Sequence, residues 1–414
     1  MKRFILTLTL LSISVIMSGC TKRQPYTQEA EKGQCELKFK PAENSESVLT
    51  LADQYVSPVS EKPSHLKDLP EGLCEDAKYF VAKLADRDIP IVLDSPEKRR
   101  DSVLYVDTDG DGRLSNEKGY TATPTEEQGL AYRFGPIPLQ FDRADGKVQA
   151  EFYVTTRRGE YLRLYPTGYR VGKIRLGKKT YKVAVIDGNF DGQYDRIFSP
   201  PVEYFYRPGC DLFAIDRNGD GRLTWDYLEV MPLSRMVRVP GYAEDAYYSI
   251  KVAADGSSLE LAKAETEFGT LDLGGAHVQC RLWSDASEQV LTGSGKEDRQ
   301  LPAGRYIASP IELRHIDTSG IRWTFRSAGE TGKLKDFEIR PGEKTSFRLG
   351  PPFSIRTTAE QRDDVVLIGF YLEGQAGIWY RPGAIRDRSR VPEPKFRIIS
   401  ESGEELTSGQ FEYG

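Results

Sequence analysis

The sequence predicts a mainly β, multidomain protein, and three observations lead to this fold class. Hydrophobic and polar residues alternate with a period of two along much of the chain, which is the pattern of strands with one buried face. Short turns separate the alternating segments, and the chain supplies 38 glycines and 24 prolines for such turns. The 414 residues also exceed a single domain of about 150 residues.

The predicted strands pair as antiparallel hairpins. The clearest strand pairs lie at 172–176 with 180–186, and at 249–253 with 258–262. Asp255-Gly256 joins the second pair, and a tight turn needs the positive φ that glycine accepts without steric cost. Further alternating segments lie at 148–154, 337–339, 345–349, 396–399 and 410–413. No apolar helical pattern longer than about two turns follows the N-terminal segment, so we expect antiparallel sheets.

The first twenty residues predict an export signal that ends in a lipidated cysteine. Lys2 and Arg3 precede an apolar segment at 4–17, which is shorter than the roughly 20 residues that span a bilayer. The following M-S-G-C motif, ending at Cys20, resembles the lipobox of bacterial lipoproteins. This resemblance implies removal of the signal peptide, acylation of Cys20 with palmitate-like chains, and anchoring in a membrane. The alternative is an ordinary secretory signal.

The resemblance also implies a location in the cell envelope. Because Thr21 rather than Asp follows the cysteine, we expect a lipid-anchored protein of the outer membrane. The expected organisation is a signal peptide at 1–19, a polar tether at 20–34, an antiparallel β-rich domain with Asp/Gly loops at 35–272, a small β-sandwich at 273–352 and, at 353–414, a terminal β-sandwich or strands that complete the preceding one. Residues 301–306 and the hairpin at 337–349 resemble the transthyretin-like modules of secreted bacterial proteins.

Four further cysteines leave two possibilities open. Cys35, Cys74, Cys210 and Cys280 allow two disulfides in an exported chain, and their spacings match no zinc motif. Cys35 and Cys74 are the closest pair in sequence, so a bridge between them is the first expectation. Buried free thiols are the alternative.

The motif D-x-[DN]-x-D-G occurs three times, in what we call the Asp107 loop (107–115), the Asp187 loop (187–195) and the Asp216 loop (216–224). The motif resembles the first half of EF-hand-type calcium loops, which also occur in dockerin-like and other extracellular repeats. Oxygens at positions 1, 3 and 5 of such loops converge on one cation, the glycine at position 6 permits a sharp turn, and the carbonyl at position 7 adds an oxygen. The expected calcium ligands are Asp107, Asp109, Asp111 and the Arg113 carbonyl; Asp187, Asn189, Asp191 and Asp195; and Asp216, Asn218, Asp220 and the Arg222 carbonyl.

All three loops lack the bidentate glutamate that an EF-hand carries at position 12. Lys118, Phe198 and Tyr227 occupy that position here, and the nearest substitutes are Glu117, Asp226 and Asp195. Alternating apolar residues lead into each loop, so strands rather than helices should precede them. Calcium would then stabilise strand connections instead of moving a helix. The alternative is an Asx-rich turn that holds no ion.

Other kinds of site have little support in the sequence. The formal net charge of -5 argues against a nucleic-acid partner. His65, His277 and His315 lie outside any metal-binding frame, and no G-x-S-x-G motif is present. The four tryptophans, Trp225, Trp283, Trp323 and Trp379, are expected in cores rather than on a sugar-binding platform.

The whole chain looks like the uncharacterised lipoproteins, rich in DxNxDG loops, of bacteria such as planctomycetes. We therefore expect a non-catalytic, calcium-binding envelope lipoprotein with a structural or interaction role. Its expected partners are the membrane, through the lipid, and another envelope protein or a polysaccharide. The alternative is an envelope hydrolase that cleaves polysaccharide through Asp and Glu side chains, with calcium in a structural role.

Overall fold

The protein is built from antiparallel β-sheets, as the computed structural model shows. Strands form 55% of the structure and no α-helix is present among its described residues, which confirms the predicted mainly β fold. The structure describes residues 32–42, 47–95, 102–124, 131–143, 146–157, 160–200, 209–224, 229–239, 246–294, 298–329, 332–362 and 365–412. The signal segment and Cys20 lie outside these ranges. Within them, no helix has the length and hydrophobicity to cross a membrane.

The first sandwich covers residues 54–166 and consists of two five-stranded antiparallel sheets around one core. One sheet has the order β3-β12-β11-β10-β9 and the other β4-β5-β6-β7-β8. Their bounds are β3 (Gln54–Val56), β4 (Pro58–Val59), β5 (Lys78–Leu84), β6 (Arg87–Asp94), β7 (Val103–Val106), β8 (Tyr120–Thr121), β9 (Thr123–Pro124), β10 (Ala131–Arg143), β11 (Gly146–Arg157) and β12 (Leu162–Pro166). Alternate residues of both sheets, such as Ile91 and Phe152, are fully buried between them.

The second sandwich combines the start of the described chain with residues 168–263. Its sheets have the orders β1-β19-β18-β17 and β16-β15-β14-β13-β2. The bounds are β1 (Lys32–Glu36), β2 (Lys38–Pro41), β13 (Gly168–Leu176), β14 (Lys179–Ile186), β15 (Leu212–Ile215), β16 (Val230–Pro232), β17 (Met236–Arg238), β18 (Tyr247–Val252) and β19 (Ser258–Lys263). Because β2 precedes the first sandwich and its partner β13 follows it, the first sandwich is an insertion within the second. The region expected to form one β-rich domain, 35–272, therefore contains two cores.

The third sandwich begins with β20 (Phe268–Asp272), which pairs with β23 (Arg299–Pro302) and, in parallel, with β27 (Lys344–Ser346). The facing sheet has the order β22-β21-β24-β25-β31-β32, and β26 pairs with β24. Its bounds are β21 (His277–Ser284), β22 (Gln289–Ser294), β24 (Gly304–Ile316), β25 (Arg322–Arg326), β26 (Phe337–Ile339), β31 (Ile385–Arg386) and β32 (Ser389–Arg390). Because β20 pairs with these later strands, the unit includes residues from Phe268 onward, whereas the expected start was residue 273.

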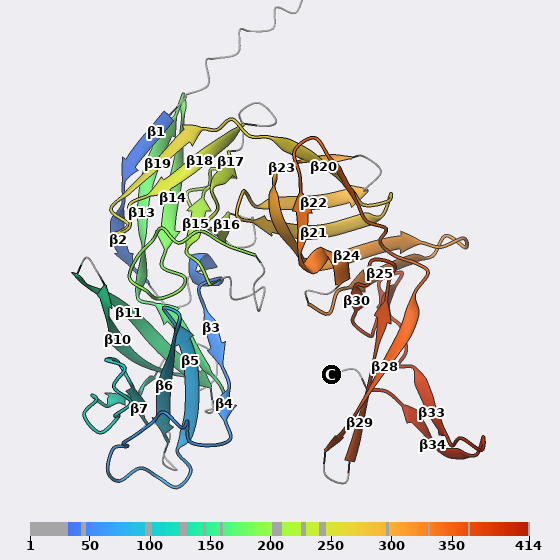
Figure 1. Cartoon of the computed structure of the whole chain (residues 1–414), viewed down its shortest axis with the longest axis horizontal. Helices are drawn as coiled ribbons and strands as arrows, with labels where there is room; N and C mark the ends of the chain where they lie inside the picture. The colour runs from blue at the N-terminus through green and yellow to red at the C-terminus, as the bar shows by residue number, and fades with distance from the viewer. Residues whose placement is uncertain are drawn as a thin grey trace, which may run out of the picture.

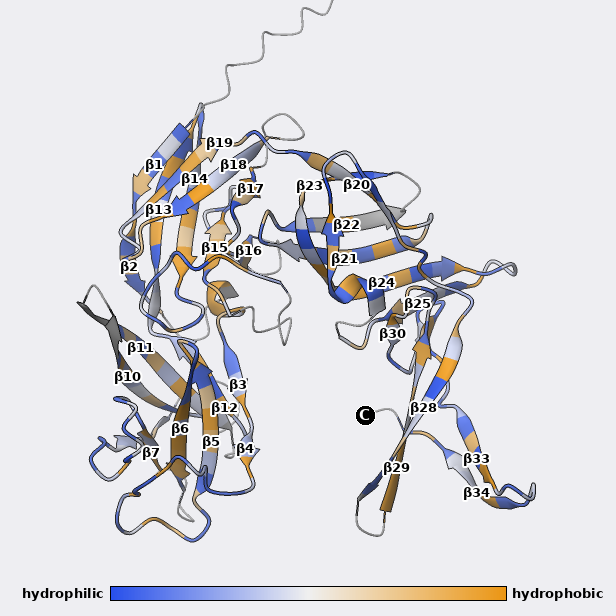
Figure 2. Ribbon diagram, in the orientation of Figure 1, coloured by the Kyte–Doolittle hydropathy of each residue, from blue (hydrophilic) through white to orange (hydrophobic). Residues whose placement is uncertain are grey.

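The C-terminal segment both completes the third sandwich and extends beyond it. β31 and β32 join the sheet of the third sandwich, and Ile378 and Tyr380 lie in its core. The remaining strands form two small sheets, β28 (Ser354–Arg362) with β29 (Val365–Glu373) and β30 (Trp379–Tyr380), and β33 (Lys395–Ile399) with β34 (Glu405–Gln410). Figure 2 shows that most of β29 is hydrophobic, yet Val365 is 58% exposed.

The sandwiches are arranged as an arch in Figure 1, with the first sandwich below the second and the third beside it. The second and third share a hydrophobic cluster in which Trp283 of β21 is fully buried. Its ring meets Phe198 edge-on, with the centroids 5.9 Å apart. Two short 3-10 helices, η1 (Ser47–Leu49) and η3 (Gly332–Lys335), pack against the second and third sandwiches. The joint is therefore continuous hydrophobic core rather than a flexible linker.

The four described cysteines are free thiols, so the expected Cys35–Cys74 bridge is absent. The two residues belong to different sandwiches. Cys35 lies on β1 beside the core of the second sandwich, where burial raises its pKa to about 11. Cys74 lies before β5 of the first sandwich, and its backbone N–H donates to Asp94. Cys210 and Cys280 are buried, in accord with the alternative of free thiols.

Candidate metal loops and an arginine-lined groove

The three aspartate loops share one backbone conformation. A strand leads directly into each loop: β7 into the Asp107 loop, β14 into the Asp187 loop and β15 into the Asp216 loop. Positions 4 and 6 have positive φ in every case, at Gly110 (78°) and Gly112 (78°), at Phe190 (59°) and Gly192 (74°), and at Gly219 (77°) and Gly221 (80°). This common conformation turns successive backbone N–H groups and side-chain oxygens toward the loop interior.

In the Asp107 loop, the position-1 carboxylate is buried and organises the turn. Asp107 is 2% exposed and accepts hydrogen bonds from the backbone N–H of Gly110 (2.8 Å) and Gly112 (3.1 Å). Asp109 accepts from the N–H of Asp111 at 3.0 Å. A carboxylate has about four lone-pair sites, so both side chains keep sites for a cation after accepting these backbone N–H groups.

Glu117, one of the expected substitutes for the missing glutamate, reaches this loop. Its carboxylate accepts from the N–H of Thr108 at 2.6 Å. Oxygens of Asp107, Asp109 and Glu117 all lie within 4.8 Å of one another, which is the arrangement of a possible metal-binding cluster. Burial raises the pKa of both Asp107 and Glu117, and the neighbouring charge of Asp109 adds to each effect. A bound cation would offset this cost of burying like charges.

Asp111 and Arg113 lie at the edge of the Asp107 loop. Asp111 is half-buried, and its carboxylate accepts from the N–H of Arg113 at 2.6 Å and from Asn116 at 3.1 Å. Arg113 is exposed and its backbone pairs with Asp68 in an isolated β-bridge. The acidic cluster consists of Asp107, Asp109 and Glu117 and does not include Asp111, which was expected as a ligand.

The Asp216 loop repeats the geometry of the Asp107 loop. Asp216 accepts from the N–H of Gly219 (2.7 Å) and Gly221 (2.8 Å). The Asn218 carbonyl oxygen accepts from the N–H of Asp220 at 2.8 Å. Asp220 in turn accepts from the N–H of Arg222 at 2.7 Å.

A glutamate that sequence reasoning missed completes the Asp216 loop. Glu229 is fully buried and accepts from the N–H of Arg217 (3.0 Å) and of Thr224 (3.0 Å). Asp226, the substitute expected from the sequence, lies outside the described residues. Glu229 follows the loop at a different spacing from Glu117, so a fixed position-12 rule does not find it.

The Asp187 loop has a similar arrangement, and its acid from outside the motif is Asp211. Asp187 accepts from the N–H of Asp191 (3.1 Å) and of Gly192 (2.8 Å). Asp211, fully buried just before β15, accepts from the N–H of Gly188 at 3.2 Å. Asp195, the acid expected here, is exposed. In all three loops, therefore, a carboxylate from outside the motif caps the N–H at position 2.

Burial dominates the electrostatics of the Asp187 loop. It raises the pKa of Asp187 to about 7, and the charge of Asp191 adds to the effect. The pKa of Asp211 is raised well above its usual value by burial and by Asp187. The side chain of Asn189 is 5% exposed, and neither its oxygen nor its nitrogen has a hydrogen-bond partner within the described part of the chain.

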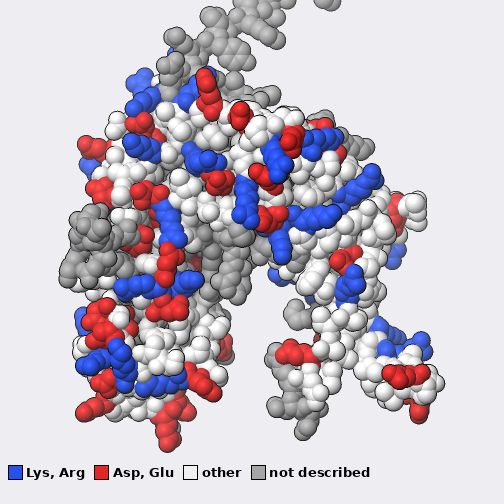
Figure 3. Space-filling model, in the orientation of Figure 1, with Lys and Arg blue, Asp and Glu red and all other residues white. Residues whose placement is uncertain are grey.

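A groove of about 1450 Å³ beside β24 and β25 forms a second candidate site. Its charged and titratable lining residues are Arg314, Arg322, Arg326 and Arg388, Glu312 and Asp387, and His277 and His315. Two histidines that are distant in the sequence thus line the same groove. Figure 3 shows Lys and Arg side chains gathered over the third sandwich around β21 and β24, among fewer acids.

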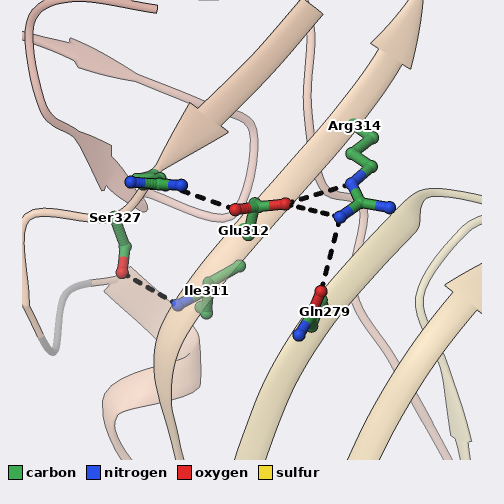
Figure 4. Close-up of polar contacts among 6 residues, drawn as sticks. Gln279, Ile311, Glu312, Arg314 and Ser327 are labelled. Atoms are coloured by element: carbon green, nitrogen blue, oxygen red, sulfur yellow. Dashed lines mark hydrogen bonds and ion pairs between the residues drawn. The ribbon is translucent and has the colours of Figure 1, made fainter. Parts of the chain in front are cut away.

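Glu312 holds two of the groove arginines in place (Figure 4). One carboxylate oxygen accepts from Arg314 at 2.9 and 3.0 Å, and the other accepts from Arg326 at 3.2 Å. Arg314 also donates to Gln279 at 3.5 Å. Each guanidinium has five donors, so both retain N–H groups for an anionic ligand.

The three tryptophans among the described residues do not form a shared platform. Trp283 is in the core, Trp323 is half-buried beneath Arg386, and Trp379 stacks on Tyr371 with the centroids 4.0 Å apart. Trp225 lies outside the described residues. No family model, no curated protein and no solved structure matches the chain.

Proposed function

We propose that the protein is a non-catalytic, calcium-binding lipoprotein of the cell envelope, in which calcium in the aspartate loops stabilises the β-sandwiches. The observation that carries this proposal is the cluster of Asp107, Asp109 and Glu117, whose oxygens lie within 4.8 Å of one another. The recurrence of a capping acid at the other two loops supports the same role for each.

The chemistry of the donors favours calcium over other ions. The loops offer carboxylate, amide and backbone oxygens but neither thiolate nor imidazole, which excludes the usual donor sets of zinc and copper. Their irregular oxygen arrangement suits calcium, which accepts six to eight ligands, better than the strict octahedron of magnesium. At about 1 mM ion and a Kd of about 0.1 mM, each site would add roughly 1.4 kcal/mol of stability.

The direct test compares thermal unfolding of three proteins in calcium and in chelator. Asp107→Asn should reduce the calcium-dependent rise in Tm because it removes an anionic ligand while keeping the shape of the side chain. Glu401→Gln, at an exposed position in the turn after β33, is the matched control and should retain the parent's response. An equal response to magnesium and calcium would argue against the assigned ion, and no response to either would remove the metal-binding proposal.

The lipid anchor is a separate part of the proposal and rests on the lipobox-like sequence before Cys20. Cys20→Ser should abolish acylation and move the protein from the membrane fraction to the soluble fraction. Metabolic labelling with a palmitate analogue measures the modification itself. Labelling that persists in Cys20→Ser would contradict the assigned lipidation site.

The groove favours a second candidate function, the binding of an acidic polysaccharide. Four arginines and two acids line the groove. Glu312 forms ion pairs with Arg314 and Arg326. Asp387 accepts a hydrogen bond from the backbone N–H of Arg322 at 3.0 Å. Acids engaged in this way hold donors in position, whereas hydrolysis of a glycosidic bond needs two carboxyl groups that face the substrate. The exposed apolar residues Val365, Val366 and Leu367 of β29 support the alternative partner, another envelope protein.

The polysaccharide proposal is tested by measuring how the protein binds polygalacturonate, which is acidic, and dextran, which is neutral, at low salt. Arg314→Gln should weaken binding of polygalacturonate, whereas Arg397→Gln, an exposed arginine of β33, should not. If the parent protein bound neutral dextran as strongly as polygalacturonate, recognition by charge would be excluded. Release of reducing ends from either polymer would instead support the hydrolase alternative.

A further inference from the structure

The Asp187 loop lies where the first and second sandwiches meet. It follows β14 of the second sandwich, yet Phe190 at its position 4 is a member of the first sandwich's core and is 1% exposed. The ring of Phe190 meets Phe152 of β11 edge-on, with the centroids 5.9 Å apart. The Asp187 loop therefore inserts one side chain across the joint.

Two polar contacts hold the loop against the β5–β6 turn of the first sandwich. The carbonyl of Asn189 accepts a hydrogen bond from the N–H of Ala85 at 2.8 Å. Arg196 forms an ion pair with Asp86 at 2.5 Å, and its backbone N–H donates to Asp211 at 2.7 Å. The capping acid of the loop is thus connected to the contact that bridges the two sandwiches.

The side chains within the loop point to a missing ligand. Asp187 and Asp191 are buried beside Asp211, and the amide of Asn189 has no hydrogen-bond partner although it is 95% shielded from solvent. An unpaired buried amide is costly, and a buried set of carboxylates needs a counter-charge. A cation at this position would satisfy both requirements.

A cavity offers a path for an ion to this loop. It has a volume of about 230 Å³ and is lined by Asp187, Gly192 and Tyr194 of the loop and by Arg170 of β13. Glu151 of β11 lines it from the first sandwich. The cavity therefore connects the joint between the sandwiches with the position-1 carboxylate.

We propose that Asp187, Asn189 and Asp191, at positions 1, 3 and 5 of the loop, bind one divalent cation that locks the first sandwich onto the second. The identity of the ion as calcium rests on the proposed function, but the site itself rests on the residues of this joint. Leu223 of the Asp216 loop lies in the cluster that the second and third sandwiches share, whereas Phe190 of the Asp187 loop lies in the core of the first. The Asp187 loop is therefore the loop whose occupancy bears on the joint between the first and second sandwiches.

Hydrogen–deuterium exchange of the mature full-length chain tests the lock, because the N–H of Ala85 donates across the joint. At calcium tenfold above Kd, linkage predicts about tenfold slower exchange of the peptide that contains Ala85 than in chelator. Asp187→Asn and Asp191→Asn should lose this slowing and bind one calcium fewer by calorimetry. Asp107→Asn, the position-1 control, should lose one calcium but keep the slowing.

The outcomes separate this inference from the proposed function. If calcium binds at the Asp107 loop but does not slow exchange at Ala85 in the parent chain, the lock is overturned and the proposed function stands. A loss of slowing in Asp107→Asn equal to that in Asp187→Asn would also overturn it, because the effect would not be local. If the parent binds no calcium, both proposals fail. The comparison of calcium and chelator in the parent requires no variant to fold.

Discussion

At the scale of single residues, the three loops depend on acids that lie outside the motif. Glu117, Asp211 and Glu229 each accept from the N–H at position 2 of a loop. The sequence indicates Glu117 because it stands next to the expected position. It does not indicate Asp211 or Glu229, because their approach depends on where the next strand returns along the sheet.

Glu229→Gln should destabilise the protein by about 1 to 3 kcal/mol, because it removes the charge and one acceptor oxygen of a buried carboxylate that accepts from three partly buried N–H groups. These donors belong to Arg217, Asn218 and Thr224. Urea unfolding measures the loss, with Glu401→Gln as the exposed control. Equal unfolding midpoints for the two variants would contradict the capping role of Glu229.

At the scale of elements, alternation and turn chemistry predict the hairpins well. β18 and β19 pair around Gly256 at φ 67°, as the Asp255-Gly256 turn indicates. The partners of β1 and β2 could not be predicted, since β1 pairs with β19 and β2 with β13, far along the chain. Local patterns specify which face of a strand is buried, but they do not specify which distant strand covers its edge.

The position-6 glycines of two loops offer a matched pair of substitutions. An added Cβ at Gly112 would lie 2.6 Å from the carbonyl oxygen of His65, whereas at Gly221 no described atom lies within 4 Å. Both residues have positive φ, which costs a non-glycine residue about 1–2 kcal/mol. Gly112→Ala should therefore destabilise the protein beyond that range and Gly221→Ala only within it. Equal losses in thermal unfolding would show that the contact with His65 relaxes freely.

At the scale of the whole molecule, the second sandwich holds the arch together. One of its sheets is buried on both faces, against its own partner sheet and against Trp283 of the third sandwich. A buried polar group lies at the same interface, because Glu288 accepts from the Trp283 indole at 3.3 Å and lies 3.6 Å from the Arg281 guanidinium. Single-sequence patterns predict neither the interface nor this ion pair, since both depend on distant strands.

The interface should weaken as the pH rises. Burial raises the pKa of Glu288 above 4.5, although Arg281 and Arg217 lower it in part. Because the folded state then binds the proton more tightly than the unfolded chain, stability should decrease as the pH rises above the ordinary glutamate pKa of 4.5. Glu288→Gln, which stays neutral, should flatten this part of the profile of urea midpoints. An unchanged slope in that variant would assign the pH dependence to other groups.

The proposed function depends most on whether the aspartate loops hold calcium. The most direct measurement is calorimetric titration of the chelated, mature protein with calcium. The proposed function predicts saturable heat with three equivalents bound, one for each of the Asp107, Asp187 and Asp216 loops, and a rise in Tm over the same range of calcium. No heat and no shift in Tm at millimolar calcium would contradict it and would leave all three loops as ordinary Asx-rich turns.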